Sequence, residues 1–347
     1  MLTLSQTTAT TRKILKITAI LIGTLLSLII IVRGLFALKE LISPTPPPPP
    51  TVSFGRLTRI AFPENATQKR LNYTLNTVSG SLPSFPDRLT VNKMNGYYPD
   101  ILGVDKANQK ASGANFPVPG SQISGNNYRW TDASQIQREL TMNILTSDFI
   151  MTSKFLDDPT VASAKSLSGP EAAKNAAIGL IQGMQLLSGD IDGSKTATTL
   201  LSIDHGALIA ATSLASTQII GVYLFQSDIN SLPVFYPKAE QSTMNFLVGS
   251  AQFDPIVVGA DFSYQAVSTI SATYPIKTAE EAYKDLKEGK GYVSTYYGGE
   301  EILIKDVFLA YYIGGEKQQY LMPIVVFKGD KGFYSYVSAV KDEWLNN

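Results

Sequence analysis

The chain has 347 residues, 44% hydrophobic and 17% charged, a composition typical of a folded protein long enough for two ordinary domains. Its 29 basic and 29 acidic side chains cancel, which excludes the one-sided positive field that attracts nucleic acid, so no nucleic-acid partner is predicted. Cysteine is absent, which excludes disulfides, thiolate nucleophiles and thiolate metal sites. His205 is the single histidine.

A long apolar segment near the N-terminus predicts a transmembrane helix over residues 17–38. No charge occurs from Ile17 to Val32, and the apolar run resumes after Arg33, so about 20 residues can cross a hydrocarbon core of roughly 30 Å. The excess of basic residues before the segment predicts a cytoplasmic tail at residues 1–16, with the rest of the chain outside the plasma membrane. A cleaved signal peptide is the alternative, but the length of the run and the lack of a small-x-small cleavage site favour an anchor.

We predict a stalk at residues 39–56. They contain "SPTPPPPPT", and consecutive prolines fix φ and remove backbone donors, which favours an extended polyproline helix. A ligand for an SH3-type module is the alternative interpretation. Because such modules are cytoplasmic, the position of the prolines just outside the predicted span favours a spacer.

Residues 57–165 predict a first extracytoplasmic domain that is rich in β-strands. Short β-like runs such as "RLTRIAF" and "NYTLNTVSG" are broken by proline and glycine, and residues 111–127 are dense in Gly, Ser, Asn and Pro, as in an exposed loop. The pattern suggests a small sheet and gives no indication of what this domain does.

Residues 166–347 predict a second extracytoplasmic domain that contains two helix-then-hairpin units. In "KTAEEAYKDLKEGKG", Thr278 and Glu281 form a capping box and Gly289 ends a helix of about three turns. The side of this helix that is predicted to face solvent carries Glu280, Lys284, Asp285, Lys287 and Glu288. The second helix, in "SGPEAAKNAAIGLIQGMQLLSGD", starts near Pro170 and runs to Gly189.

Each predicted helix is followed by two strands that we interpret as a hairpin. The first pair is "IIGVYLFQ" and "LPVFYP", joined by residues 227–230, and the second pair is "ILIKDVFLAYYI" and "YLMPIVVFKG", joined by residues 314–317. The returning strands carry Pro233 and Pro323 near their starts, where proline is tolerated. The predicted class is α+β, with antiparallel sheets each packed against a helix.

The second unit, with "YLMPIVVFKGDKGFYSYVSAV", resembles the C-terminal part of the YycH/YycI-type membrane-anchored regulators and, more loosely, PepSY-like domains. The likeness covers roughly residues 218–342 together with the single N-terminal span; residues 57–165 show no counterpart. It implies an extracytoplasmic α+β protein that contacts another membrane protein such as a sensor kinase and performs no chemistry.

Candidate site residues have ordinary structural explanations. Asp190, Asp192 and Ser194 begin like a calcium loop, but Lys195 and Leu201 replace its essential glycine and glutamate. His205 beside Asp204 lacks a placed nucleophile, so a histidine in a turn is predicted. Six strand tyrosines could form an aromatic surface but are better explained as sheet residues; these are Tyr296, Tyr297, Tyr311, Tyr312, Tyr334 and Tyr336. No catalytic, metal or cofactor-binding residue is predicted.

Two classes of function remain open. The first is a non-catalytic interaction or regulatory protein, held outside the membrane by its span and stalk, that senses or modulates a membrane partner. The second is an envelope enzyme or cell-wall polymer-binding protein that uses carboxylates only, since glycosidases need just two of them at the right separation. The missing catalytic motifs favour the first class.

Overall fold

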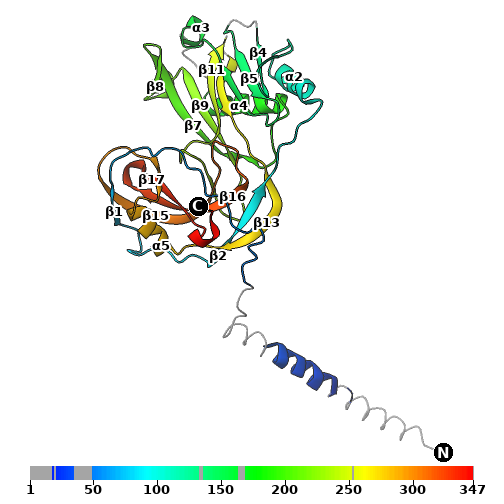
Figure 1. The fold of residues 1–347 in the computed structure, drawn as a ribbon, viewed down its shortest axis with the longest axis vertical. Coiled ribbons are helices and arrows are strands. Elements are labelled where there is room, and N and C mark those ends of the chain that lie inside the picture. Colours follow the sequence, from blue (N-terminus) through cyan, green and yellow to red (C-terminus); the bar gives the residue numbers. More distant parts are fainter. Residues whose placement is uncertain are drawn as a thin grey trace, which may run out of the picture. The chain divides into compact units, whose positions relative to one another are not determined.

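The computed structural model describes residues 18, 21–34, 49–132, 136–162, 169–251 and 254–346. The chain forms two compact units, residues 1–49 and residues 50–347 (Figure 1). The second unit holds almost all of the sheet and helix, and its mixture of strands with a few short helices confirms the α+β class.

In the first unit, residues 21–34 are helical. The large side chains from Leu21 to Val32 are exposed, Ile30 by 70%. The remainder of the predicted span 17–38, apart from residue 18, lies outside the described residues. Among the residues that are described, no helix reaches the length and apolarity needed to cross a bilayer.

The second unit contains two sheets, which form its lower and upper parts in Figure 1. The eight-stranded sheet has the path β1-β15-β16-β17-β14, with β10 added beside β15, β2 added beside β16, and β13 added beside β2. Its strands are β1 (Asn72–Leu75), β2 (Arg88–Met94), β10 (Val234–Phe235), β13 (Val267–Pro275), β14 (Tyr292–Thr295), β15 (Glu301–Tyr312), β16 (Tyr320–Gly329) and β17 (Tyr334–Ser338).

The nine-stranded sheet has the order β3-β4-β5-β6-β12-β11-β9-β7-β8, and every neighbouring pair is antiparallel. Its strands are β3 (Ser121–Ser124), β4 (Asn127–Thr131), β5 (Glu139–Asn143), β6 (Phe149–Thr152), β7 (Ile191–Asp204), β8 (Ala207–Ala210), β9 (Ile219–Gln226), β11 (Met244–Ala251) and β12 (Asp254–Phe262).

Short helices cover the sheets. They are α2 (Gly103–Gly113), α3 (Pro159–Ala162), α4 (Pro170–Gly183) and α5 (Ala279–Lys287), with three 3-10 turns, η1 (Leu214–Ser216), η2 (Asp330–Gly332) and η3 (Asp342–Trp344). Small alanines on α2 and α4 pack among the buried residues of the nine-stranded sheet. Ala282 and Leu286 of α5 do the same for the eight-stranded sheet.

The central strand β16 is buried on both faces, which explains its almost unbroken apolar run. Val325 and Phe327 lie in the cluster that includes α5, whereas Ile324 and Val326 lie in an aromatic cluster on the other side. By contrast, β5 buries only Leu140 and Met142, and the alternate positions of this strand are half-buried polar residues. Buried and half-buried residues alternate in β5 because one face of that strand is covered. They do not alternate in β16 because both of its faces are covered.

The helix in the second predicted unit is confirmed and the upstream helix needs correction. Both hydrogen bonds of the Thr278–Glu281 capping box form. For α4, the N-cap is Gly169 with φ +90° and no side-chain cap, and the helix ends at Gly183 rather than near Gly189. It stops there because Gln185 has a left-handed φ of +57°, which breaks the helical path.

One of the two predicted hairpins forms. Strands β15 and β16 pair antiparallel along most of their length, which confirms the second hairpin. The first is wrong, because β9 belongs to the nine-stranded sheet while β10 pairs in parallel with β15 of the other sheet. The connecting residues cross between the sheets, and Asn230 donates a hydrogen bond to the Tyr311 hydroxyl at 3.0 Å.

The predicted boundary at residue 165 does not separate the two sheets. Strands β1 and β2, from before this residue, pair with β15, β13 and β16 from after it. The predicted stalk also ends earlier than residue 56, because Val52 donates its backbone N–H to the Thr273 carbonyl and Phe54 donates to the Tyr274 hydroxyl. Residues 51–56 therefore belong to the folded unit.

Candidate functional site

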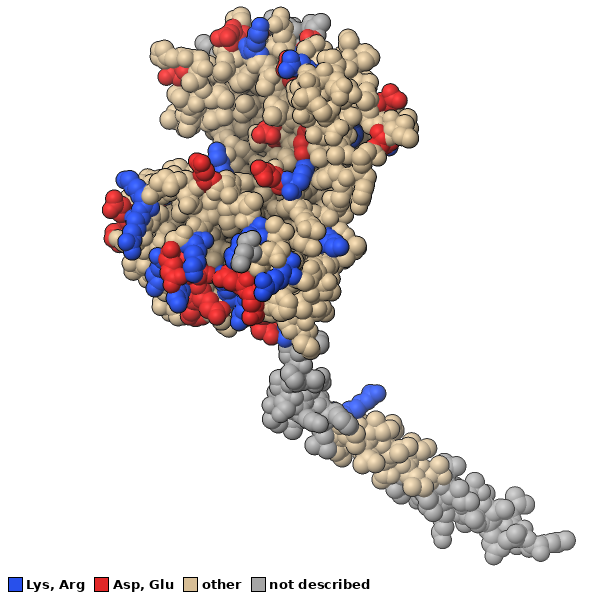
Figure 2. Space-filling model, in the orientation of Figure 1, with Lys and Arg blue, Asp and Glu red and all other residues tan. Residues whose placement is uncertain are grey.

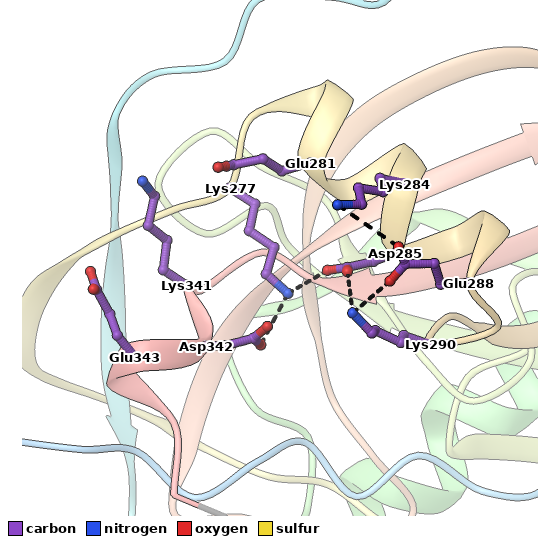
Figure 3. A pocket seen from close by; sticks show the side chains of 9 residues that line it. All are labelled: Lys277, Glu281, Lys284, Asp285, Glu288, Lys290, Lys341, Asp342 and Glu343. Carbon is purple, nitrogen blue, oxygen red and sulfur yellow. Dashed lines mark hydrogen bonds and ion pairs between the residues drawn. The ribbon is translucent and has the colours of Figure 1, made fainter.

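A shallow pocket of about 330 Å³ beside α5 is lined entirely by charged residues (Figure 3). It is lined by Lys277, Glu281, Lys284, Asp285, Glu288, Lys290, Lys341, Asp342 and Glu343. Figure 2 shows the same mixture of red and blue atoms at the lower left of the molecule. We refer to these nine residues as the ionic cluster.

Three segments bring the ionic cluster together. Lys277 follows β13, α5 contributes Asp285 together with more exposed charged side chains, and Asp342 lies in η3 near the C-terminus (Figure 3). The backbone N–H of Lys277 donates to the Ala339 carbonyl at 2.7 Å, which ties the entry of α5 to the segment before η3. The cluster therefore depends on contacts that are distant in sequence.

A buried ion pair forms the centre of the cluster. Lys277 Nζ lies 2.7 Å from Asp285 Oδ2, and both residues are only 8% exposed. Lys290 Nζ donates to Asp285 Oδ1 at 3.1 Å, and Lys277 also reaches Asp342 Oδ1 at 3.2 Å. The prediction that Asp285 faces solvent was wrong, because lysines from outside α5 cover this carboxylate.

The lysines of the cluster lower the pKa of two of its carboxylates. Burial alone would raise the pKa of Asp285, but the hydrogen bonds from Lys277 and Lys290 outweigh burial, and the net pKa lies below its usual value. The hydrogen bond from Lys290 lowers the pKa of Glu288 in the same way. A general acid needs a raised pKa, so this arrangement suits structural pairing and charge recognition better than proton transfer.

A second polar constellation joins the two sheets. Lys317, in the loop between β15 and β16, donates to Asp148 Oδ1 at 2.6 Å, to Ser263 Oγ at 3.2 Å and to the Tyr264 carbonyl at 3.0 Å. Its ammonium also lies 5.1 Å from the centre of the Tyr97 ring. Desolvation lowers the pKa of Lys317 despite the opposing effect of Asp148.

Gln265 extends this junction through its side-chain amide. The amide donates to the backbone carbonyls of Gly314 and Glu316 at 2.9 and 3.0 Å, and its oxygen accepts from the N–H of Gln318 at 3.0 Å. The loop between β15 and β16 is thus held by several hydrogen bonds to residues 263–265, which follow β12. Sequence reasoning missed the roles of Lys317 and Gln265, since no local pattern marks a contact between distant strands.

The residues that resemble a calcium loop have protein partners. Asp190 accepts from the Tyr264 hydroxyl at 2.7 Å and from Gln226 Nε2 at 2.9 Å, which makes it part of the junction between the sheets. Asp192 accepts from the backbone and hydroxyl of Ser194 at 2.9 and 2.6 Å. Across the described parts of the chain, no group of three or more acidic or histidine side chains gathers closely enough to hold a metal ion.

His205 lies at the tip of the hairpin between β7 and β8. Its φ of +47° and the φ of +75° at Gly206 describe a tight two-residue turn of the kind that matches strand twist. The imidazole is 93% exposed and lies 2.7 Å from Asp204. The predicted turn histidine is confirmed.

The candidate aromatic surface is mostly core. Tyr311, Tyr312 and Tyr336 are at most 1% exposed, and Tyr334 is also buried. Tyr296 is half-buried, and Tyr297 is 72% exposed in the turn before β15. The interpretation as sheet residues is confirmed for the four buried tyrosines, whereas Tyr296 and Tyr297 lie beyond the end of β14.

Comparisons with known proteins do not identify a family. No family model matches the chain, and no curated protein matches it. Among solved structures, an uncharacterized protein from Eubacterium rectale ATCC 33656 aligns over 81% of this chain and 87% of its own, with 12% identity and a TM-score of 0.34. At this TM-score the likeness carries no argument about fold or function.

Proposed function

We propose that the chain is a single-pass membrane protein whose extracytoplasmic part acts by contact with a membrane partner and performs no chemistry. The apolar segment at residues 21–34 carries this proposal. An α-helix turns about 100° per residue, so the five consecutive exposed residues Leu28, Ile29, Ile30, Ile31 and Val32 cover its whole circumference. A helix that is apolar all round belongs in a protein core or in lipid.

The chain that follows this segment supports the same proposal. A run of five prolines ends at Pro50, where the second compact unit begins. Such a run forms an extended spacer of about 3.1 Å per residue, so it would hold the folded unit away from the bilayer surface. The basic residues before the span place the short N-terminal tail in the cytoplasm and the folded unit outside.

A regulatory role is the most specific form of the proposal. The capped helix α5 and the β15–β16 hairpin, which carry the resemblance to YycH/YycI-type regulators, are both present. The ionic cluster lies beside α5 and offers a surface of mixed charge that favours specific over general binding. We propose a membrane protein such as a sensor kinase as the partner.

The alternative is an envelope enzyme or wall-polymer binder that uses two carboxylates with separated pKa values. In the ionic cluster, the pKa values of Asp285 and Glu288 are both lowered. Burial and the nearby Asp148 raise the pKa of Asp261, which lines a pocket of about 280 Å³ elsewhere. That pocket has no second carboxylate among the described residues that line it. This distribution supports recognition over hydrolysis.

The absence of cysteine allows a direct test of the topology, because a single introduced cysteine is the sole thiol. Val78→Cys places a thiol at a fully exposed site in the folded unit, and Ser5→Cys places one in the predicted tail. With a membrane-impermeant maleimide on intact cells, we expect labelling at position 78, and labelling at position 5 only after permeabilisation. Recovery of the chain in the soluble fraction, or equal labelling at both sites, would contradict the anchor.

A further inference from the structure

Strand β8 presents an unprotected edge of the nine-stranded sheet. It is the terminal strand of that sheet and, among the described strands, pairs only with β7, in a regular register without a bulge. No hydrogen bond from another described segment reaches its outer side. At the other end of the sheet, a bulge between Gln122 and Ser124 interrupts the pairing of β3, a common device that prevents further strand addition.

Two edges of the eight-stranded sheet, at β14 and β13, are bonded to other segments of the chain. Val293 of β14 donates its N–H to the Asn65 side chain and accepts from the N–H of Ala66. Thr273 of β13 accepts from the N–H of Val52. The edge at β8 differs from these because no segment that the structure describes bonds to its outer backbone groups, and open edges of this kind pair readily with another strand.

The sequence around β8 lacks the residues that normally block such pairing. Between Lys195 and Asp228, the single Asp, Glu, Lys or Arg is Asp204, and there is no proline. Ile209 and Leu214 are each 46% exposed. Figure 2 shows the surface over β7 and β8, at the upper left, as largely tan. Charged and proline gatekeepers on edge strands prevent association, and β8 has none.

The geometry of the hairpin fixes which backbone groups are free. Asp204 pairs with Ala207 across the two-residue turn, and Ala211 donates to the Leu200 carbonyl at 2.9 Å, so residues 207, 209 and 211 bond inward to β7. Leu208 and Ala210 therefore direct their N–H and C=O groups outward. These are the groups that a further strand would use.

We propose that the occupant of this edge is β8 of a second copy of the same chain, paired antiparallel about a two-fold axis at Ile209. Leu208 would then exchange hydrogen bonds with Ala210 of the other copy. The two Ile209 residues would face each other as a non-hydrogen-bonded pair, with Cα atoms about 4.5 Å apart.

Charge and size both fit a second copy. A strand without charge meets its own copy without repulsion, whereas it offers nothing to attract a charged partner strand. The carboxylate of Asp204 lies 2.7 Å from Nδ1 of His205 in its own turn, away from the contact. Pairing through a four-residue strand buries far less area than the roughly 1,600 Å² of a stable interface. The dimer therefore needs a high local concentration, and the proposed anchor would supply it by confining the copies to one membrane. In that respect the inference rests on the proposed function.

The test uses single cysteines in the full chain, in membranes and in detergent at high concentration. For Ile209→Cys we expect a disulfide-linked dimer, because the expected Cα separation lies within the disulfide range of about 4.4–6.8 Å. Ile150→Cys is the matched control, since Ile150 is 53% exposed on an interior strand of the same sheet. We expect at least tenfold more dimer at position 209.

A second variant tests the pairing itself. Adding Ala210→Pro to Ile209→Cys removes an outward N–H without touching a bond to β7, so circular dichroism should be unchanged while the dimer is lost. Equal crosslinking at positions 209 and 150, crosslinking that survives the proline, or capture of a different protein at position 209 would each overturn the proposal. A dimer at 209 in a chain recovered as soluble protein would refute the anchor and retain the pairing.

Discussion

Replacing Lys277 by methionine will lower the free energy of unfolding by about 3 kcal/mol. The change leaves the buried carboxylate of Asp285 without its closest cation, which lies 2.7 Å away, and Lys290 at 3.1 Å compensates only in part. Removing one partner of a buried ion pair is costly because the other charge remains out of water. Chemical denaturation of the full chain in detergent measures the effect.

Two control variants separate the ion pair from the loss of a charge. Lys284→Met removes a lysine that is 74% exposed on α5, the helix that carries Asp285, and should change stability by less than about 0.5 kcal/mol. The double variant Lys277→Met with Asp285→Leu should recover most of the loss, because an apolar pair of similar volume replaces the ionic one. A full loss in the double variant would contradict this explanation.

The same pair predicts a dependence on pH. Since the folded-state pKa of Asp285 is lowered, its contribution is complete above the unfolded value of about 3.9 and is lost as the pH falls through the folded value. We expect wild-type stability to decline below about pH 4 and Lys277→Met to decline less over the same interval. Parallel declines in the two proteins would show that another group is responsible.

Replacing Gly113 by alanine will lower the free energy of unfolding by about 2–3 kcal/mol. The C-terminal ends of α2 and α4 meet at Gly113 and Gly183, and a Cβ at Gly113 would overlap the carbonyl oxygen of Gly183. Because that neighbour is backbone, the two helices must separate on the sheet that both cover, and this outweighs the better helix propensity of alanine.

Gly179→Ala is the matched control for this effect. Gly179 lies inside α4, and a Cβ there would meet nothing within 4 Å. We expect this variant to be more stable than the wild type by about 0.5–1 kcal/mol, as for an exposed helical glycine. Thermal unfolding of both variants in one buffer gives the comparison. Equal effects of the two substitutions would refute the close contact between α2 and α4.

Local signals in the sequence predicted local structure well. The capping box at Thr278 and Glu281 located α5, and the aromatic and aliphatic runs located β15 and β16 as a hairpin. In each case the physics acts between residues a few positions apart, where a single sequence contains all the participants.

Nonlocal pairing could not be predicted in the same way. The run "IIGVYLFQ" was identified correctly as a strand, but its pairing partner follows from the register of the whole sheet and not from the next apolar run. Likewise Asp285 falls at a solvent-facing position of an isolated helix, and only Lys277 and Lys290 bury it. The ionic cluster and the Lys317 junction emerge from such contacts.

Crosslinking in intact membranes, followed by identification of the captured proteins, tests the central claim most directly. The full chain and a variant without residues 17–38 are compared under identical conditions. We predict that the full chain captures a specific membrane protein and that the variant, with the same folded unit, does not. Failure of the full chain to capture any membrane protein, together with hydrolytic activity of the folded unit on an envelope polymer, would contradict the proposal.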